Sequence, residues 1–218
     1  MKGERRRIVA TSVSAARRRS TWLALAASVV WLAAAASSGG VGIWSAIGGA
    51  AIALGVAVLL VDRPAAAALL RPSPRLVLLG VLAGGSMAAA TYVLYPALAR
   101  SSPWIATDAA RLYAAFRAPS LLVASLALLP VIVGEELVWR GAMQTALVQR
   151  FGPRAGVAWA AVAYALANTP IGSPVLVAVA LCCGLAWGIL RATTASLVPS
   201  LIAHLLWNAL VLIWLPLA

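Results

Sequence analysis

Long apolar runs separated by short polar turns dominate the chain. The runs occupy residues 21–38, 41–61, 76–97, 119–148, 155–169, 174–191 and 195–217. A helix needs about 20 apolar residues to cross a bilayer, and most of these runs approach or exceed that length. The pattern therefore predicts an all-α fold, a polytopic transmembrane helical bundle of about seven helices.

The polar positions divide this bundle into three parts. Residues 1–20 form a basic arm, and residues 21–118 hold the first three spans followed by a mixed segment. That segment, 98–118, mixes charges with aromatic residues and is typical of an interfacial helix or an outer loop. Residues 119–217 form a compact core of four helices. Pro130 interrupts the first of these helices, which predicts a kink or a short break there.

Composition strengthens the membrane interpretation. Hydrophobic residues make up 63% of the 218 positions and charged residues 10%, whereas soluble domains are about 45–50% apolar and about 25% charged. The net charge of +12 falls mainly on the arm and on alternate turns, so it argues against nucleic acid and for anionic lipid as the partner.

The same charge pattern predicts a multi-pass protein of the cell (inner) membrane with a cytoplasmic N-terminus. Seventeen basic residues are nearly all arginine, which favours a bacterial source. The oligomeric state is left open.

Two of the five acidic residues, Glu135 and Glu136, sit side by side inside an apolar run. The other three, Glu4, Asp62 and Asp108, fall in segments expected to be exposed to water. A carboxylate at mid-bilayer costs at least about 2.5–3.5 kcal/mol, so an intramembrane pair indicates a functional site. Arg140 follows Glu136 by one helical turn, where it can pair with it.

Helical rise places further polar groups at the same depth as Glu135. At about 1.5 Å per residue, Glu135 and Asn168 both lie about 20 Å from the basic end of their helices. On the same scale, His204 and Asn208 lie about 15 and 21 Å from that end. His204 and Asn208 are also four residues apart and share one helix face. We therefore expect these groups from three helices to converge.

Such a layer suits hydrolysis of a peptide bond. A carboxylate in a low-dielectric cavity can take a proton from water, and an imidazole and a carboxamide can stabilise an oxyanion. Glu135, His204, Asn208 and Asn168 are the candidate catalytic residues, with Glu136 and Arg140 as structural support. Asn168 precedes Thr-Pro, so capping of a helix end is an open alternative for it.

The chain offers little for a metal or another cofactor. It has one histidine and no His-Glu-x-x-His pattern, and Cys182 and Cys183 are adjacent, which suits neither a zinc site nor a structural disulfide. We therefore expect no cofactor and no metal.

The motifs resemble a known family. The run from Glu135 to Arg140 matches Glu-Glu-x-x-x-Arg, and His204 with Asn208 matches His-x-x-x-Asn, in the CPBP intramembrane proteases, also called the CAAX protease or Abi family and related to Rce1-type prenyl-protein endopeptidases. The resemblance covers about residues 119–215. It implies an intramembrane glutamic endopeptidase with a water-accessible cavity among the last four helices, acting on membrane-anchored or lipidated protein or peptide substrates.

One position departs from the family pattern. Where the family usually has Phe-x-x-x-His, this chain has Tyr164 and Asn168. Asparagine can orient water but cannot take its proton. Two alternatives therefore stay open: a catalytically weak or inactive relative that acts as a binding or regulatory scaffold, and a small proton-coupled transporter that uses Glu135.

Overall fold

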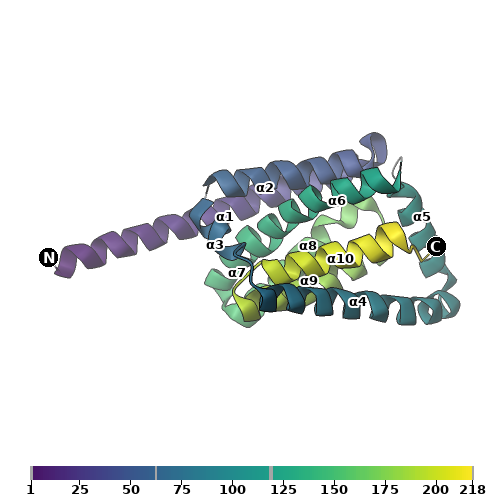
Figure 1. Ribbon diagram of the computed structural model, residues 1–218. Coiled ribbons are helices and arrows are strands. Elements are labelled where there is room, and N and C mark those ends of the chain that lie inside the picture. The colour runs from purple at the N-terminus through teal and green to yellow at the C-terminus, as the bar shows by residue number, and fades with distance from the viewer. Residues whose placement is uncertain (1, 62, 118–119, 218) are drawn as a thin grey trace.

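The computed structural model describes residues 2–61, 63–117 and 120–217, with side chains from residue 21 onward. Every regular element in these residues is a helix, which confirms the all-α prediction. Figure 1 shows the bundle, with the first half of α1 projecting beyond it. The N-terminal part contains α1 (Lys2–Val41), the π-helical η1 (Trp44–Gly48), α2 (Gly49–Val61), α3 (Arg63–Leu69), α4 (Pro74–Ser101) and α5 (Pro103–Ala115).

The C-terminal part begins with one nearly continuous helix. It comprises α6 (Leu121–Glu136), the π-helical η2 (Leu137–Met143) and α7 (Gln144–Phe151). It is followed by α8 (Pro153–Ala167), the short 3₁₀ turn η3 (Thr169–Ile171), α9 (Pro174–Thr194), α10 (Val198–Asn208) and the π-helical η4 (Ala209–Trp214).

Five stretches are long and apolar enough to cross a membrane: Thr21–Val41, Trp44–Val61, Pro74–Ser101, Leu121–Phe151 and Pro174–Thr194. Val198–Trp214 is a shorter apolar helix, and α8 is a further helix of 15 residues. Together these seven helices match the seven predicted runs. The chain is a multi-pass membrane protein of helical-bundle architecture.

Several boundaries differ from the sequence pattern. The first turn centres on Gly42, with φ +84°, because α1 continues through the glycines at 39 and 40. The basic segment between the apolar runs 41–61 and 76–97, where a turn was expected, contains α3. Pro130 does not break the chain's longest apolar run, since α6 continues through it. The irregularity lies instead in η2, directly after the glutamate pair, where the helix widens by one residue per turn.

Serine and proline set the starts of three helices. Ser73, Ser120 and Ser173 precede α4, α6 and α9, and each hydroxyl accepts a hydrogen bond from a backbone N–H of the first turn. In α4 and α9 a proline follows at the first helical position, where its missing N–H costs nothing. Ser173 and Pro174 together therefore determine where α9 begins.

The N-terminal spans pack directly against α6 and α10, the helices that carry the two glutamates and His204. Helix α2 packs on α6, and α4 packs on α10. A Cβ on Gly134 would lie 2.5 Å from the carbonyl carbon of Ala51, and one on Gly84 would lie 2.9 Å from the Cα of Ala203. Gly134 precedes Glu135, and Ala203 precedes His204. These two contacts therefore set how closely α2 and α4 approach the backbone beside the polar layer.

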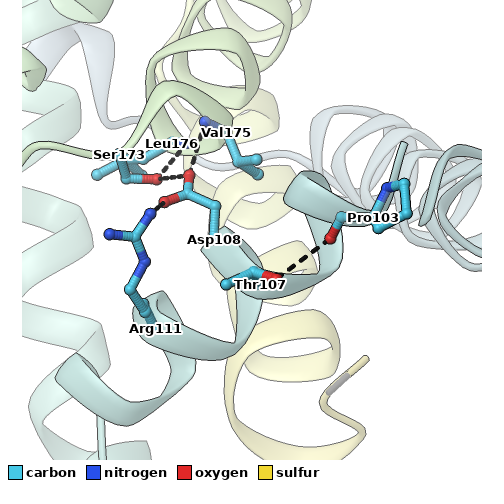
Figure 2. Close-up of polar contacts among 7 residues, drawn as sticks. All are labelled: Pro103, Thr107, Asp108, Arg111, Ser173, Val175 and Leu176. Atoms are coloured by element: carbon cyan, nitrogen blue, oxygen red, sulfur yellow. Dashed lines mark hydrogen bonds and ion pairs between the residues drawn. The ribbon is translucent and has the colours of Figure 1, made fainter.

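Helix α5 is tied to the start of α9 by Asp108 (Figure 2). The carboxylate of Asp108 accepts hydrogen bonds from the Ser173 hydroxyl at 2.6 Å and from the Val175 N–H at 3.1 Å, and Arg111 pairs with it at 2.8 Å. Only 2% of Asp108 is exposed, so the expectation that it faces water was wrong. Its negative charge is stabilised at the positive end of α9. Glu4 and Asp62, expected to face water, lie outside the residues with described side chains.

Candidate active site

The two glutamates end α6 and lie inside the bundle. Glu136 is completely buried, while Glu135 keeps 7% of its surface exposed. Both sit where α6 passes into η2, and π-helical turns are frequent at functional sites. Of the pair, Glu135 is therefore the carboxylate that keeps some contact with the surface.

His204 lies between the two carboxylates. Its Nδ1 is 3.0 Å from Glu136 Oε1, and its Nε2 is 4.0 Å from Glu135 Oε2. An ionised carboxylate only accepts hydrogen bonds, so with Glu136 ionised the Nδ1 atom carries a proton and donates it. The Nε2 atom then points toward Glu135. The geometry brings together two of the predicted groups, from α6 and α10.

Glu136 and Arg140 form the expected pair, with 3.4 Å between Arg140 Nη1 and Glu136 Oε1. Arg140 is 2% exposed. Its guanidinium carbon lies 4.5 Å from the centre of the Tyr164 ring and 5.0 Å from that of the Trp187 ring. Cations gain attraction from aromatic faces when desolvated. The guanidinium is therefore held by one carboxylate and two rings.

Two further residues of the site were missed by the sequence reasoning. Tyr164, which stands where the family usually has phenylalanine, donates its hydroxyl to Glu135 Oε2 at 2.8 Å. Trp187 stacks on the His204 ring, with centroids 3.6 Å apart and planes 22° apart. Tyr164 lies four residues before Asn168, so the two share one helix face. This spacing could have identified Tyr164 as a residue of the site. No sequence signal singled out Trp187.

The two asparagines are less directly involved. Asn168 is buried and ends α8, and its Nδ2 donates to the Tyr164 carbonyl at 2.8 Å on the same helix. The helix-end alternative for this residue thus has a contact to support it. Asn208 lies one turn beyond His204 and is half-buried. Its amide makes no hydrogen bond to the other described residues, and a role for either side chain in catalysis stays a prediction.

Several buried polar atoms near the site have no hydrogen-bond partner among the residues with described side chains. They are Trp31 Nε1, Glu136 Oε2, Trp139 Nε1, Arg140 Nη1 and Nη2, Gln144 Oε1, Trp187 Nε1 and Arg191 Nε. An unpaired buried polar group costs about 1–3 kcal/mol. Eight such atoms would cost as much as the roughly 5–15 kcal/mol that stabilises a typical protein, so most of them require a partner.

A cavity of about 320 Å³ lies between η1, α2 and α6. Its walls are apolar and include Trp44, Gly48, Ile52 and Val131. None of the polar site residues lines it. The water-accessible cavity expected among the last four helices stays a prediction.

Within the described part of the chain, no three His, Cys, Asp or Glu side chains are grouped so as to hold a metal ion. Cys182 and Cys183 are free, and Cys183 alone of the two is buried. The absence of a cofactor remains an expectation from the sequence.

Fold and site together define a polytopic helical membrane protein with a buried Glu–His–Arg cluster. Residues 117–210 match the family model for type II CAAX prenyl endopeptidase Rce1-like proteins. The match confirms the resemblance drawn from the two motifs and falls on the C-terminal helices that carry the site. Neither a curated protein nor a solved structure is significantly similar to the chain.

Proposed function

We propose that the protein is an intramembrane endopeptidase that hydrolyses a peptide bond in membrane-associated or lipidated proteins. The observation that carries this proposal is the position of His204, whose Nε2 lies 4.0 Å from Glu135 while its Nδ1 is held by Glu136. The family match supports the same reaction class.

In the proposed reaction, Glu135 takes a proton from a water molecule whose oxygen attacks the scissile carbonyl carbon. The C–O bond forms as the carbonyl oxygen becomes an oxyanion. A protonated His204 donates from Nε2 to this oxyanion, with Asn208 as a second donor. Glu135 then passes its proton to the leaving nitrogen as the C–N bond breaks.

The surrounding residues have positioning roles in this proposal. The Tyr164 hydroxyl fixes the Glu135 carboxylate by a 2.8 Å hydrogen bond. Glu136, paired with Arg140, orients the His204 ring. Charge is balanced, because two carboxylates face one guanidinium and one imidazole that can be protonated. This balance supports a site in which His204 donates a hydrogen bond to the oxyanion.

The arginine distribution supports the proposed orientation in the inner membrane of a bacterium. The turn after α3 is linked to the turn before α10 by the hydrogen bond from the Leu197 N–H to the Leu69 carbonyl. Arg71 and Arg191 thus belong to the same end of the bundle, while Arg111 on α5 lies at the other end (Figure 1). We assign the first end to the cytoplasm.

Glu135→Gln tests the proposal. The variant keeps the shape of the side chain and the Tyr164 contact but cannot take a proton. We expect substrate processing to fall to background in membranes while the abundance of the protein is unchanged, as measured by quantitative mass spectrometry of membrane-protein termini. Leu129→Ala is the matched control, because Leu129 lies on the same helix and is 51% exposed. Processing that continues in Glu135→Gln would refute the proposal.

A binding or regulatory scaffold is the second candidate. The observation that favours it is the Asn168 amide, which is engaged with its own helix at 2.8 Å and has no group able to take a proton. A scaffold would keep its cellular phenotype in Glu135→Gln, whereas a protease would lose it.

A further inference from the structure

Three polar side chains lie one turn apart on the continuous helix formed by α6, η2 and α7. They are Glu136, Arg140 and Gln144, with 0%, 2% and 2% of their surfaces exposed. Each carries at least one atom without a hydrogen-bond partner in the described part of the chain: Oε2 of Glu136, both Nη atoms of Arg140 and Oε1 of Gln144. The Arg140–Glu136 contact at 3.4 Å is an ion pair but leaves these Nη atoms without a hydrogen bond.

Helix α9 carries a second set of such atoms opposite the first. Trp187 Nε1 and Arg191 Nε also lack partners among the described residues, and these two residues are again one turn apart. The two sets face each other. The Gln144 amide donates to the Gly188 carbonyl at 2.9 Å, and the Arg140 guanidinium carbon lies 5.0 Å from the centre of the Trp187 ring.

The chemistry of these atoms selects water as the ligand. Four are donors, on Arg140, Trp187 and Arg191, and two are acceptors, on Glu136 and Gln144. An anion would satisfy the donors alone and a cation the acceptors alone. Water donates and accepts, and buried waters typically make about three hydrogen bonds to buried polar groups. Polar groups within a membrane protein commonly line such hydrated paths.

The backbone of Gly188 lies close to the Gln144 amide. A Cβ at position 188 would lie 3.2 Å from Gln144 Oε1 and 3.1 Å from Val157 Cγ1. A larger side chain would therefore crowd the unpaired oxygen. The half-buried Arg191 lies near the end of α9 and marks where the path reaches the end of the bundle.

We infer that a file of ordered water molecules runs from Arg191 past Gln144 and Arg140 to Glu136 and His204. The hydration itself depends only on the unpaired atoms. Its use, to deliver the reacting water to Glu135 from the Arg191 end, rests on the proposed endopeptidase function. Gln144 is then a positioning residue for water and does not touch the substrate.

Radiolytic hydroxyl-radical labelling of the full chain in lipid nanodiscs tests the inference, because radicals form from water bound beside a side chain. With ¹⁸O-labelled water, we expect Trp187 to be oxidised with ¹⁸O incorporation although only 2% of it is exposed. Gln144→Met, which removes the acceptor and keeps the side-chain length, should lower this labelling several-fold. Gln149→Met is the matched control on the exposed side of the same helix and should leave it unchanged.

Gly188→Ala provides a second variant should Gln144→Met not accumulate. It adds one methyl group beside Gln144 Oε1 and should also lower Trp187 labelling. Trp187 labelling at background in the wild type would overturn the inference, and so would wild-type labelling of Trp187 in both Gln144→Met and Gly188→Ala. Labelling that behaves as expected while Glu135→Gln still processes substrate would retain the water file and remove the proposed function.

Discussion

Substitution of Gly134 by alanine probes how the N-terminal spans hold the site. Gly134 sits at the contact of α6 with α2, directly before Glu135. An added Cβ would lie 2.5 Å from the carbonyl carbon of Ala51 and 3.1 Å from the Ile52 nitrogen. All these atoms belong to the backbone, so no side-chain rotation relieves the clash. Ordinary contact needs about 3.5 Å, and the two helices must therefore separate by roughly 1 Å.

The expected cost follows from two opposing effects. Overpacking a close contact costs about 1–3 kcal/mol, whereas alanine gains about 1 kcal/mol over glycine inside a helix. Gly141→Ala is the matched control, because a Cβ there would meet the Glu136 carbonyl oxygen at 3.6 Å and Leu197 at 3.7 Å, both ordinary contacts. Relative to this control, Gly134→Ala should lower the free energy of unfolding by about 1–3 kcal/mol.

Tryptophan fluorescence during titration with dodecyl sulfate in mixed micelles measures the difference between the two variants. Gly134→Ala should unfold at a lower detergent fraction than Gly141→Ala. Its substrate processing should also fall, because displacement of α6 changes the position of Glu135 relative to His204, and a misplacement of about 1 Å can cost roughly 100-fold in rate. Equal unfolding curves for the two variants would show that α2 does not limit the position of α6.

Three further substitutions have defined outcomes. Arg140→Ala removes the guanidinium that pairs with the buried Glu136 and should cost about 3–5 kcal/mol, seen as a strong loss of folded protein by fluorescence-detected size exclusion. Normal abundance would contradict the support role of Arg140. Asp108→Ala removes the hydrogen bonds that join α5 to α9 and should lower the free energy of unfolding by about 1–3 kcal/mol in the dodecyl sulfate titration. Arg111→Ala, at a side chain that is 70% exposed, should change it by less than about 1 kcal/mol. Equal effects of the two substitutions would argue against a stabilising role of Asp108 at the start of α9. Tyr164→Phe frees Glu135 Oε2 and should change the pH profile of processing more than the unfolding curve; an unaltered profile would remove Tyr164 from the site.

The sequence alone carried the fold class and much of the site. Apolar runs of about 20 residues have the length of a membrane-spanning helix, and a helix satisfies all its backbone hydrogen bonds within the segment, so the spans followed from composition and length. The pairing of Glu136 with Arg140 followed from their four-residue spacing. The shared depth of Glu135 and His204 followed from counting residues, and their side chains do lie 4.0 Å apart.

Only the tertiary structure decided which atoms meet. The stacking of Trp187 on His204, the hydrogen bond of Tyr164 to Glu135 and the capping of α9 by Asp108 each join residues 17 or more positions apart. Depth in the membrane is one coordinate, and it leaves the rotation of each helix about its axis undetermined. That rotation is set by close packing, notably of Gly134 against Ala51 and of Gly84 against Ala203, which no local pattern in the chain expresses.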